Sequence, residues 1–282
     1  MIGSRIGDLG RHLALLIIVA LTISAASSLA LADFKDGKQA FDRRDYAAAA
    51  KHWRQAAEAG DARSQTYLGV LYAWGRGVKK NLPRAIKLYR QAARGGDAQG
   101  QYNLGLMYRS GRGVRTNETK AAEWFAKAAK QGMASAQYML GLAHRYGRGA
   151  EKSNTKGAKL IRKAAKAGYL PAQYGLGRLY ETGRGVERDL SKAAVWYRRA
   201  AERGYGPAQY ELGLAYRRGE GVRADPVMAY MWLTLAIKRI KGELKKNASA
   251  KRARLAMKMS TAQLGRAEKR AAAWRPKKAK AK

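Results

Sequence analysis

Few residues of this chain are of the types that usually carry out chemistry. The sequence has 3 histidines and no cysteine, so thiolate metal sites and cysteine nucleophiles are excluded. His12 lies in an apolar N-terminal segment, while His52 and His144 stand alone, outside any H-E-x-x-H motif or acidic cluster. No serine occupies a G-x-S-x-G motif. We therefore predict no catalytic residue and no metal site.

Glycine pairs separated by one residue could be mistaken for phosphate-binding loops. They occur at Gly75/Gly77, Gly111/Gly113, Gly147/Gly149, Gly183/Gly185 and Gly219/Gly221. A dinucleotide-binding loop also needs a preceding β-strand and a third glycine in register, and the sequence predicts neither. We interpret the pairs as turns between helices. Accordingly, we predict no cofactor and no enzymatic activity.

Without a predicted catalytic, metal or nucleotide site, the function that remains is binding of a partner. Aromatic and basic side chains are strong candidates for this, because they often dominate binding energy. Such residues occupy positions that differ from one repeat to the next, in the helix that ends at each glycine pair. They could form a groove if these helices line the concave side of the protein. The candidate partner-binding residues are Tyr67, Asn103, Arg109, Arg145, Tyr146, Arg178 and Arg217. Further variable positions hold Val70, Ala73, Trp74, Leu106, Ser110, Met139, Leu142, Gly175, Glu181, Thr182, Glu211, Leu214 and Arg218. The alternative is an ordinary solvated face.

A large positive charge supports two interpretations of what the protein binds. The 57 Lys and Arg against 20 Asp and Glu give a net charge of +37. This charge could steer an acidic protein or peptide into the groove. Alternatively, the basic surface and tail could hold anionic lipid headgroups or an acidic polysaccharide; nucleic acid ranks last, because export is expected. The basic tail residues are Arg275, Lys277, Lys278, Lys280 and Lys282.

A repeating element must position these side chains. Leu-Gly pairs recur every 36 residues, at Leu68-Gly69, Leu104-Gly105, Leu140-Gly141, Leu176-Gly177 and Leu212-Gly213. The glycine pairs of the turns share this period. Two features with one period indicate a structural unit that stacks on its neighbours, as in a solenoid.

Each unit is expected to contain two antiparallel helices. Helix A, over residues 98–109 of the second unit, has apolar residues at helical spacing. Helix B should begin after a side chain that caps its N-terminus, namely Asn81, Asn117, Ser153, Asp189 or Asp225. It should end at a glycine that can adopt left-handed backbone angles, namely Gly60, Gly96, Gly132, Gly168 or Gly204. The predicted fold class is all-α.

The glycine inside each helix A needs a steric reason, since glycine costs about 1 kcal/mol relative to alanine there. We expect helix B to approach the backbone at this point, with an aromatic side chain in the space of the missing Cβ. Trp124 and Trp196 are the expected residues. Their replacement by alanine should then cost about 3–5 kcal/mol.

The ends of the chain depart from the repeat. Residues 1–32 resemble a cleavable signal peptide, with Arg5 and Arg11 before an apolar run and Ala30-Leu31-Ala32 before the expected cut. The protein is therefore expected in a bacterial periplasm or cell envelope. An atypical helix pair (33–61) and five repeats (62–240) should follow, the last helix running on towards Gly242. We predict a linker and capping helix over 241–274, with a Ser260–Gln263 capping box, and a disordered basic tail over 275–282.

The blocks resemble the SEL-one-like repeat family, which is related to the tetratricopeptide repeats. In the fourth block the resemblance is carried by Ala172-Gln173, Leu176-Gly177, Tyr180, Gly183-Arg184-Gly185-Val186, Asp189, Lys192-Ala193, Trp196-Tyr197, Ala200-Ala201 and Gly204. It covers Ala62 to about Ile240. The third block departs from the pattern at His144, Ala150 and Gly157, so its turn and helix B are expected to be looser. The resemblance implies a right-handed superhelix of antiparallel helix pairs that acts as an adaptor for protein complexes.

Overall fold

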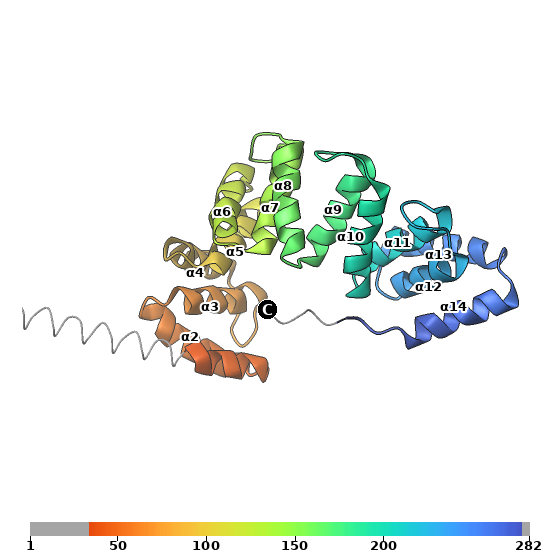
Figure 1. The fold of residues 1–282 in the computed structure, drawn as a ribbon. Helices are drawn as coiled ribbons and strands as arrows, with labels where there is room; N and C mark the ends of the chain where they lie inside the picture. Colours follow the sequence, from red (N-terminus) through yellow and green to blue (C-terminus); the bar gives the residue numbers. More distant parts are fainter. Residues whose placement is uncertain (1–33, 278–282) are drawn as a thin grey trace, which may run out of the picture. The chain divides into compact units, whose positions relative to one another are not determined.

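The computed structural model describes residues 34–277, and every regular element in this range is a helix (Figure 1). A helix over residues 34–42 comes first. It is followed by α2 (Tyr46–Glu58), α3 (Ala62–Trp74), α4 (Leu82–Arg94), α5 (Ala98–Ser110), α6 (Glu118–Lys130), α7 (Ala134–Tyr146), α8 (Asn154–Lys166), α9 (Leu170–Thr182), α10 (Leu190–Glu202), α11 (Gly206–Arg218), α12 (Pro226–Ile237), α13 (Gly242–Ala256) and α14 (Thr261–Ala273). The predicted signal peptide and tail residues 278–282 lie outside the described range.

The chain divides into two compact units, Met1–Ala128 (unit 1) and Ala129–Lys282 (unit 2). In unit 1, α2 packs on α3, α3 on α4, and α4 on α5. In unit 2, each helix from α7 to α11 packs on the next, while α13 and α14 both pack on α12. This packing of successive helices confirms the predicted all-α solenoid class.

The starts of the helices B lie where the sequence predicts them. Asn81 accepts a hydrogen bond from the backbone N–H of Arg84 at 2.9 Å, and Asp189 accepts one from Lys192 at 2.8 Å. The other three predicted caps make the same bond, namely Asn117, Ser153 and Asp225. Each bond satisfies a backbone N–H that has no partner within its helix.

A glutamine in each helix A ties it to the helix before it. The amide Nε2 of Gln65 donates to the carbonyl oxygen of Ala57 at 3.1 Å. The equivalent bonds join Gln101 to Ala93, Gln137 to Ala129, Gln173 to Ala165 and Gln209 to Ala201. Each of these carbonyls also accepts the backbone N–H of the glycine that closes its helix, as Ala57 does from Gly60 at 3.1 Å. The glutamine therefore adds a second hydrogen bond, which joins the two helices. The resemblance to the SEL-one-like repeats includes an Ala-Gln pair at this position, but only the structure shows what the glutamine binds.

The glycine inside helix A is required by the close approach of helix B, as predicted. A Cβ on Gly105 would lie 2.6 Å from Cε1 of Phe125, and a Cβ on Gly177 would lie 2.5 Å from Cε1 of Tyr197. Neither distance is compatible with a real side chain. The glycines therefore fix the separation of the two helices in each pair.

The residue that fills this space is not the predicted tryptophan. Phe125 is 2% exposed and packs on the glycine, whereas Trp124 and Trp196 are only half-buried. Successive residues of a helix are turned by about 100°, so Trp124 lies to one side of the contact. Its ring instead lies 4.0 Å from Nζ of Lys127. The predicted role of Trp124 and Trp196 was wrong by one helical position.

The glycine pairs are structural turns, as predicted. The first glycine ends helix A with a positive φ, which is 73° at Gly219. The second glycine lies against the start of the preceding helix B, where a Cβ on Gly221 would overlap the carbonyl of Leu190. Gly77, Gly113 and Gly185 lie in the same way against the start of the preceding helix B, so these pairs pack one repeat against the repeat before it.

The C-terminal end differs from the prediction in two places. α12 ends at Ile237 rather than running on towards Gly242, because Ile240 turns into the core and is buried with Leu233. The expected linker contains α13. Its alanine and lysine residues favour a helix, and Ala248 packs in the same cluster as Ile240.

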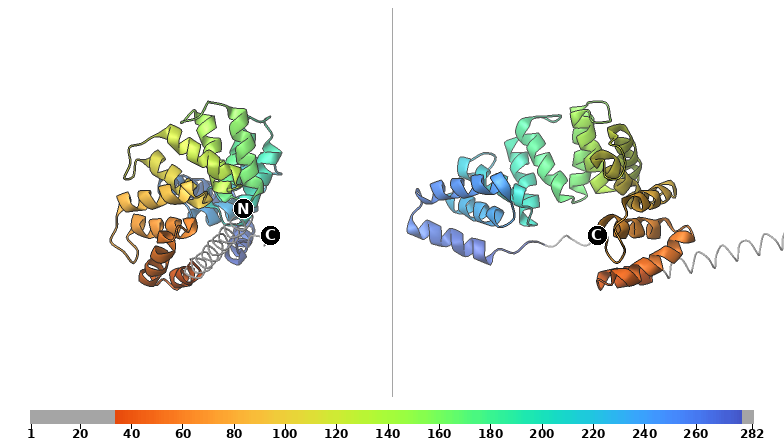
Figure 2. Two further views of the ribbon diagram at one scale, coloured as in Figure 1. Left: turned by 90° about the vertical axis from the view of Figure 1, so that its left-hand side faces the viewer. Right: turned by 180° about the vertical axis from the view of Figure 1, so that it is seen from behind.

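α14 matches its prediction and closes on α12. The capping box is present, with the Ser260 hydroxyl accepting from the Gln263 N–H at 3.2 Å and the Gln263 carboxamide accepting in return at 2.9 Å. Trp274, directly after α14, meets Trp232 of α12 with ring centroids 6.3 Å apart. In Figure 2 the blue C-terminal helices lie together.

Candidate functional site

Several of the variable positions meet around one cavity in unit 1. It has a volume of about 290 Å³ and lies between α3, α4 and α5. The lining residues are Val70, Trp74, Tyr89, Asn103, Leu106, Met107, Arg109, Ser110 and Arg112. Six of these belong to the positions that the sequence singles out. We call this the Trp74 cavity.

Trp74 is the most unusual residue of this cavity. It is the last residue of α3, and 61% of its surface is exposed. The guanidinium of Arg112, from the turn after α5, lies over its ring at 5.2 Å from the centroid. An exposed tryptophan that no fold contact requires, held beside an arginine, is typical of a binding surface.

The walls and rim of the Trp74 cavity differ in character. Val70, Leu106 and Met107 give apolar walls, and Arg109 and Arg112 supply positive charge. The lining residues include no acidic side chain. Burial raises the pKa of the wall residue Tyr89 well above its ordinary value, against the opposing effect of Arg112. The phenol is therefore neutral, and the cavity is apolar with a positive rim.

The remaining unit 1 candidate, Tyr67, lies elsewhere. Its ring packs against Phe34 and Trp53, with centroids 5.6 and 4.9 Å away. It therefore belongs to the core of the first helix pairs. Asn103, in contrast, lines the cavity and accepts a hydrogen bond from Gln99 at 2.9 Å.

In unit 2, Tyr146 occupies the repeat position of Trp74 and is 54% exposed. The guanidinium groups of Arg145 and Arg148 lie 5.2 and 5.6 Å from its ring centroid. Arg145 and Arg217 are equivalent, half-buried residues, and the Nε atom of each has no hydrogen-bond partner among the described residues.

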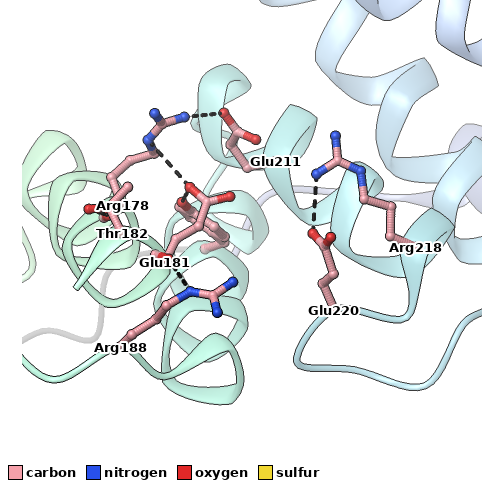
Figure 3. Close-up of polar contacts among 8 residues, drawn as sticks. Arg178, Glu181, Thr182, Arg188, Glu211, Arg218 and Glu220 are labelled. Carbon is pink, nitrogen blue, oxygen red and sulfur yellow. Dashed lines mark hydrogen bonds and ion pairs between the residues drawn. The ribbon is translucent and has the colours of Figure 1, made fainter.

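Arg178 lies between two carboxylates, as Figure 3 shows. Its Nη1 donates to Glu211 at 3.0 Å, and its Nε lies 3.4 Å from Glu181. Glu181 also accepts a hydrogen bond from the hydroxyl of Tyr197 at 2.9 Å. The charge of Arg178 is thus neutralised within the protein, and a partner would have to displace these bonds. We call these four residues the Arg178 cluster.

The environment of the Arg178 cluster shifts the pKa values of its members. Burial, and then the charge of Glu181, raises the pKa of Glu211 above its ordinary value, although Arg178 opposes this. Burial, followed by the charges of both glutamates and the hydrogen bond to Glu181, raises the pKa of Tyr197. The hollow beside the cluster measures only about 10 Å³. This part of unit 2 is filled by its own side chains.

The described part of the tail folds back on unit 2. Lys277 Nζ binds the carboxylate of Glu202 at 2.8 Å, and its backbone N–H donates to the Glu202 carbonyl at 2.8 Å. Arg275 donates to the carbonyls of Ala272 and Trp274. Lys278, Lys280 and Lys282 lie outside the described residues.

Sequence reasoning missed Arg112 and Tyr89. A signal for Arg112 exists, since arginine stands between the two glycines in four of the five pairs, at Arg76, Arg112, Arg148 and Arg184. Three of these lie over an aromatic ring of their own unit, as Arg76 does over Tyr46 at 5.5 Å. No such signal identifies Tyr89, because it is a core residue that also faces the cavity.

Residues 34–277 hold neither a metal centre made of acidic and histidine side chains nor a membrane-spanning helix. No group of three or more His, Asp or Glu side chains is placed to hold a metal ion in this range. Nor does any helix there have the length and apolar character needed to cross a bilayer.

Six consecutive segments match the Sel1 repeat, namely residues 29–61, 62–97, 98–133, 134–169, 170–205 and 206–239. The first segment includes the helix pair that the sequence analysis treats as atypical. None of the curated proteins matches this chain.

Two solved structures are similar in both sequence and fold. One is a protective antigen present in uropathogenic Escherichia coli strains that displays an SLR fold, with 33% identity and a TM-score of 0.80 over 88% of this chain. The match covers 53% of the antigen, so this chain spans about half its length. The other is a Sel1 repeat protein from Oxalobacter formigenes, with 32% identity and a TM-score of 0.66, covering 73% of this chain and 85% of that one.

Proposed function

This chain belongs to the Sel1 repeat family, and we propose that it is a non-enzymatic scaffold that binds an acidic protein or peptide at the Trp74 cavity. Sel1 repeat proteins typically act in protein–protein interaction. For this chain, we propose the Trp74 cavity as the binding site and an acidic segment as the partner. We also propose that the protein acts outside the cytoplasm.

The observation that carries the proposal is the exposed Trp74 beside a cavity with apolar walls and an arginine rim. Small-molecule pockets commonly measure about 300–1,000 Å³, so this cavity is at the lower limit and suits one large side chain. The positive rim, and Arg112 in particular, favours carboxylates next to that side chain. Trp and Arg are also enriched among residues that dominate binding energy.

The partner is therefore a segment with an aromatic or large aliphatic residue flanked by Asp or Glu. The excess of positive charge attracts such a segment from a distance and raises the association rate. Unit 2 supplies less to this interaction, because the Arg178 cluster already neutralises its own charges.

A selection of displayed random peptides on the full chain tests this proposal. We expect the selected peptides to share an apolar residue next to a carboxylate. Trp74→Ala should weaken binding of such a peptide about 30-fold, because a hot-spot residue contributes about 2 kcal/mol. Titration calorimetry measures the change, and circular dichroism checks that the variant is folded.

Tyr146→Ala is the matched control, because Tyr146 is an exposed aromatic residue at the same repeat position in unit 2, also beside arginines. It should leave the affinity unchanged. Equal losses for both variants, or selected peptides without carboxylates, would contradict the proposal.

Export rests on the N-terminal sequence and is tested separately. A C-terminally tagged full chain should appear in the periplasmic or envelope fraction of a bacterial host, with its N-terminus at Asp33. Recovery in the cytoplasm with the first residues intact would rule out the proposed location.

A further inference from the structure

Unit 2 ends in a strongly basic segment that is not part of the Trp74 cavity. Residues 238–277 contain 14 Lys and Arg but only two acidic residues, Glu243 and Glu268. The segment comprises α13, α14 and their flanks, which pack on α12. A local excess of this size costs folding energy through repulsion, so its concentration at one end calls for an anionic partner.

Only some of these cations have a role in the fold. Arg239 lies over the ring of Trp274 at 4.7 Å, and Arg252 lies over Tyr230 at 5.6 Å. Others are exposed and form no ion pair within residues 34–277, namely Lys245, Arg254, Lys258, Arg266 and Lys269. They are therefore available to a ligand.

α13 separates its buried and exposed residues onto two faces. Ala248 is fully buried, and Leu244 and Leu255 pack partly against the core. On the other side, Lys246, Ala250 and Arg254 follow at steps of four residues, and Lys258 comes directly after the C-cap of the helix; all four are exposed. Residues at this spacing lie along one helix face, so α13 presents a basic stripe to solvent.

Met257 adds an apolar group to this stripe. It is the C-cap residue of α13, between Arg254 and Lys258 in sequence, and 87% of its surface is exposed. This is the highest exposure among the large hydrophobic residues of the described chain. The thioether has no packing role in the fold, yet it stands at the junction of two basic helices.

We propose that the α13–α14 end of unit 2 docks on an anionic lipid surface. Met257 enters the headgroup region, and Arg254 and Lys258 bind the charged headgroups. Both parts of the stripe contribute there, since interfacial helices combine apolar burial with attraction of cations to anionic lipids. A soluble polyanion would use the cations and leave Met257 in water, which makes lipid the better fit. This proposal is independent of the Trp74 cavity.

Vesicle flotation with the full chain tests the electrostatic part. The protein should float with vesicles of phosphatidylcholine and phosphatidylglycerol but not with phosphatidylcholine alone. The double variant Arg254→Gln, Lys258→Gln should bind about 30-fold more weakly, because each cation contributes about fivefold. Its matched control is Lys159→Gln, Lys163→Gln on α8, two exposed lysines of unit 2 with the same spacing. The control should bind like the unchanged protein.

Insertion of the apolar group has its own readout. Because the chain has no cysteine, Met257→Cys gives a single labelling site for an environment-sensitive fluorophore. Its emission should shift to the blue with anionic vesicles and be quenched by lipid-attached quenchers. Val195→Cys, at an exposed position on α10, is the control and should show neither effect.

Three results would overturn the proposal. The first is equal loss of binding in the α13 and α8 double variants. The second is binding without a spectral change at position 257, which indicates attraction by charge alone. The third is binding to heparin or DNA with no binding to anionic vesicles, which indicates a soluble polyanion instead of lipid.

Discussion

The two units carry the same repeat positions and fill them in opposite ways. In unit 1, positions around Trp74 and Asn103 leave a cavity of about 290 Å³ with an arginine rim. In unit 2, the positions of Arg178, Glu181 and Glu211 are occupied by charges that bind one another, beside a hollow of about 10 Å³. One helical frame thus gives an open cavity around Trp74 in unit 1 and a closed cluster around Arg178 in unit 2.

This difference shows which residues set the frame and which set the surface. The helix A glycines and the glutamine bonds to the preceding helix occur in both units. The surface depends instead on the side chains next to them. A basic residue such as Arg178 counts as a binding residue only if its neighbours leave its charge free.

The largest expected effect concerns the shared frame. Phe125→Ala in unit 1 and Tyr197→Ala in unit 2 should each lower the free energy of unfolding by about 3–5 kcal/mol, because each removes a buried ring that packs on a glycine. Trp124→Ala and Trp196→Ala should cost only about 1 kcal/mol, since these rings are half-buried. Urea unfolding of the four variants measures this. Similar losses within each neighbouring pair would show that the tryptophans also hold the frame.

The second prediction separates the arginines of the two units. Arg178→Ala should destabilise the protein by about 1–2 kcal/mol, because it leaves the carboxylate of Glu211 poorly solvated and without its partner. This loss of stability is small because 46% of the Arg178 side chain is exposed, and solvent screens its ion pairs. Arg112→Ala should change stability by less than about 0.5 kcal/mol, since Arg112 lies over an exposed ring. Thermal unfolding distinguishes the two, and a larger loss for Arg112 would reverse the comparison.

A feature of these units can be predicted from the sequence when the residues that determine it lie close together along the chain. The period of 36 residues predicts the helix pairs, their caps and their turns, because each depends on residues close in sequence. It also predicts that Trp74, Asn103 and Arg109 share a surface. It cannot predict that Arg178 is neutralised, since Glu211 lies 33 residues away and their contact depends on the packing of one repeat on the next.

Two other predictions failed for local reasons. Trp124 and Phe125 are adjacent aromatic residues, and only the rotation of helix B about its axis decides which one faces Gly105. α13 was expected to be part of a linker because it carries no repeat motif. It nevertheless forms a helix, because its residues have high helix propensity and Ala248 is buried in the core.

The third prediction concerns charge at the open surface. Arg112→Gln should weaken binding of an acidic peptide about fivefold and reduce its salt dependence, because a rim charge acts mainly through long-range attraction. Arg184→Gln, the equivalent residue of a turn in unit 2, should change neither. Affinities at low and high salt check this. An equal effect at Arg184 would mean that net charge, and not the Trp74 cavity, directs the peptide.

The smallest expected effect is a dependence on pH that has opposite signs at two glutamates of unit 2. Burial, and then the charge of Glu181, raises the pKa of Glu211 above its ordinary value of 4.5. The folded state therefore favours the protonated carboxyl, and the stability it contributes is present below the unfolded pKa and lost as pH rises through the folded pKa. The pKa of Glu151 is lowered by its hydrogen bond and ion pair with Lys156, so its contribution is present at neutral pH and lost on acidification.

Glu211→Gln should thus gain stability relative to the unchanged protein as pH rises from about 4 to about 7, whereas Glu151→Gln should lose it over the same range. Urea midpoints of the three proteins at both pH values measure these differences. The opposite signs make each variant a control for the other, since a general effect of pH on a basic protein would shift both in one direction. If the Glu211 difference stayed constant with pH, its carboxylate would be as well solvated as in the unfolded chain. The Arg178 cluster would then be an open surface like that around Trp74, and the contrast between the two units would disappear.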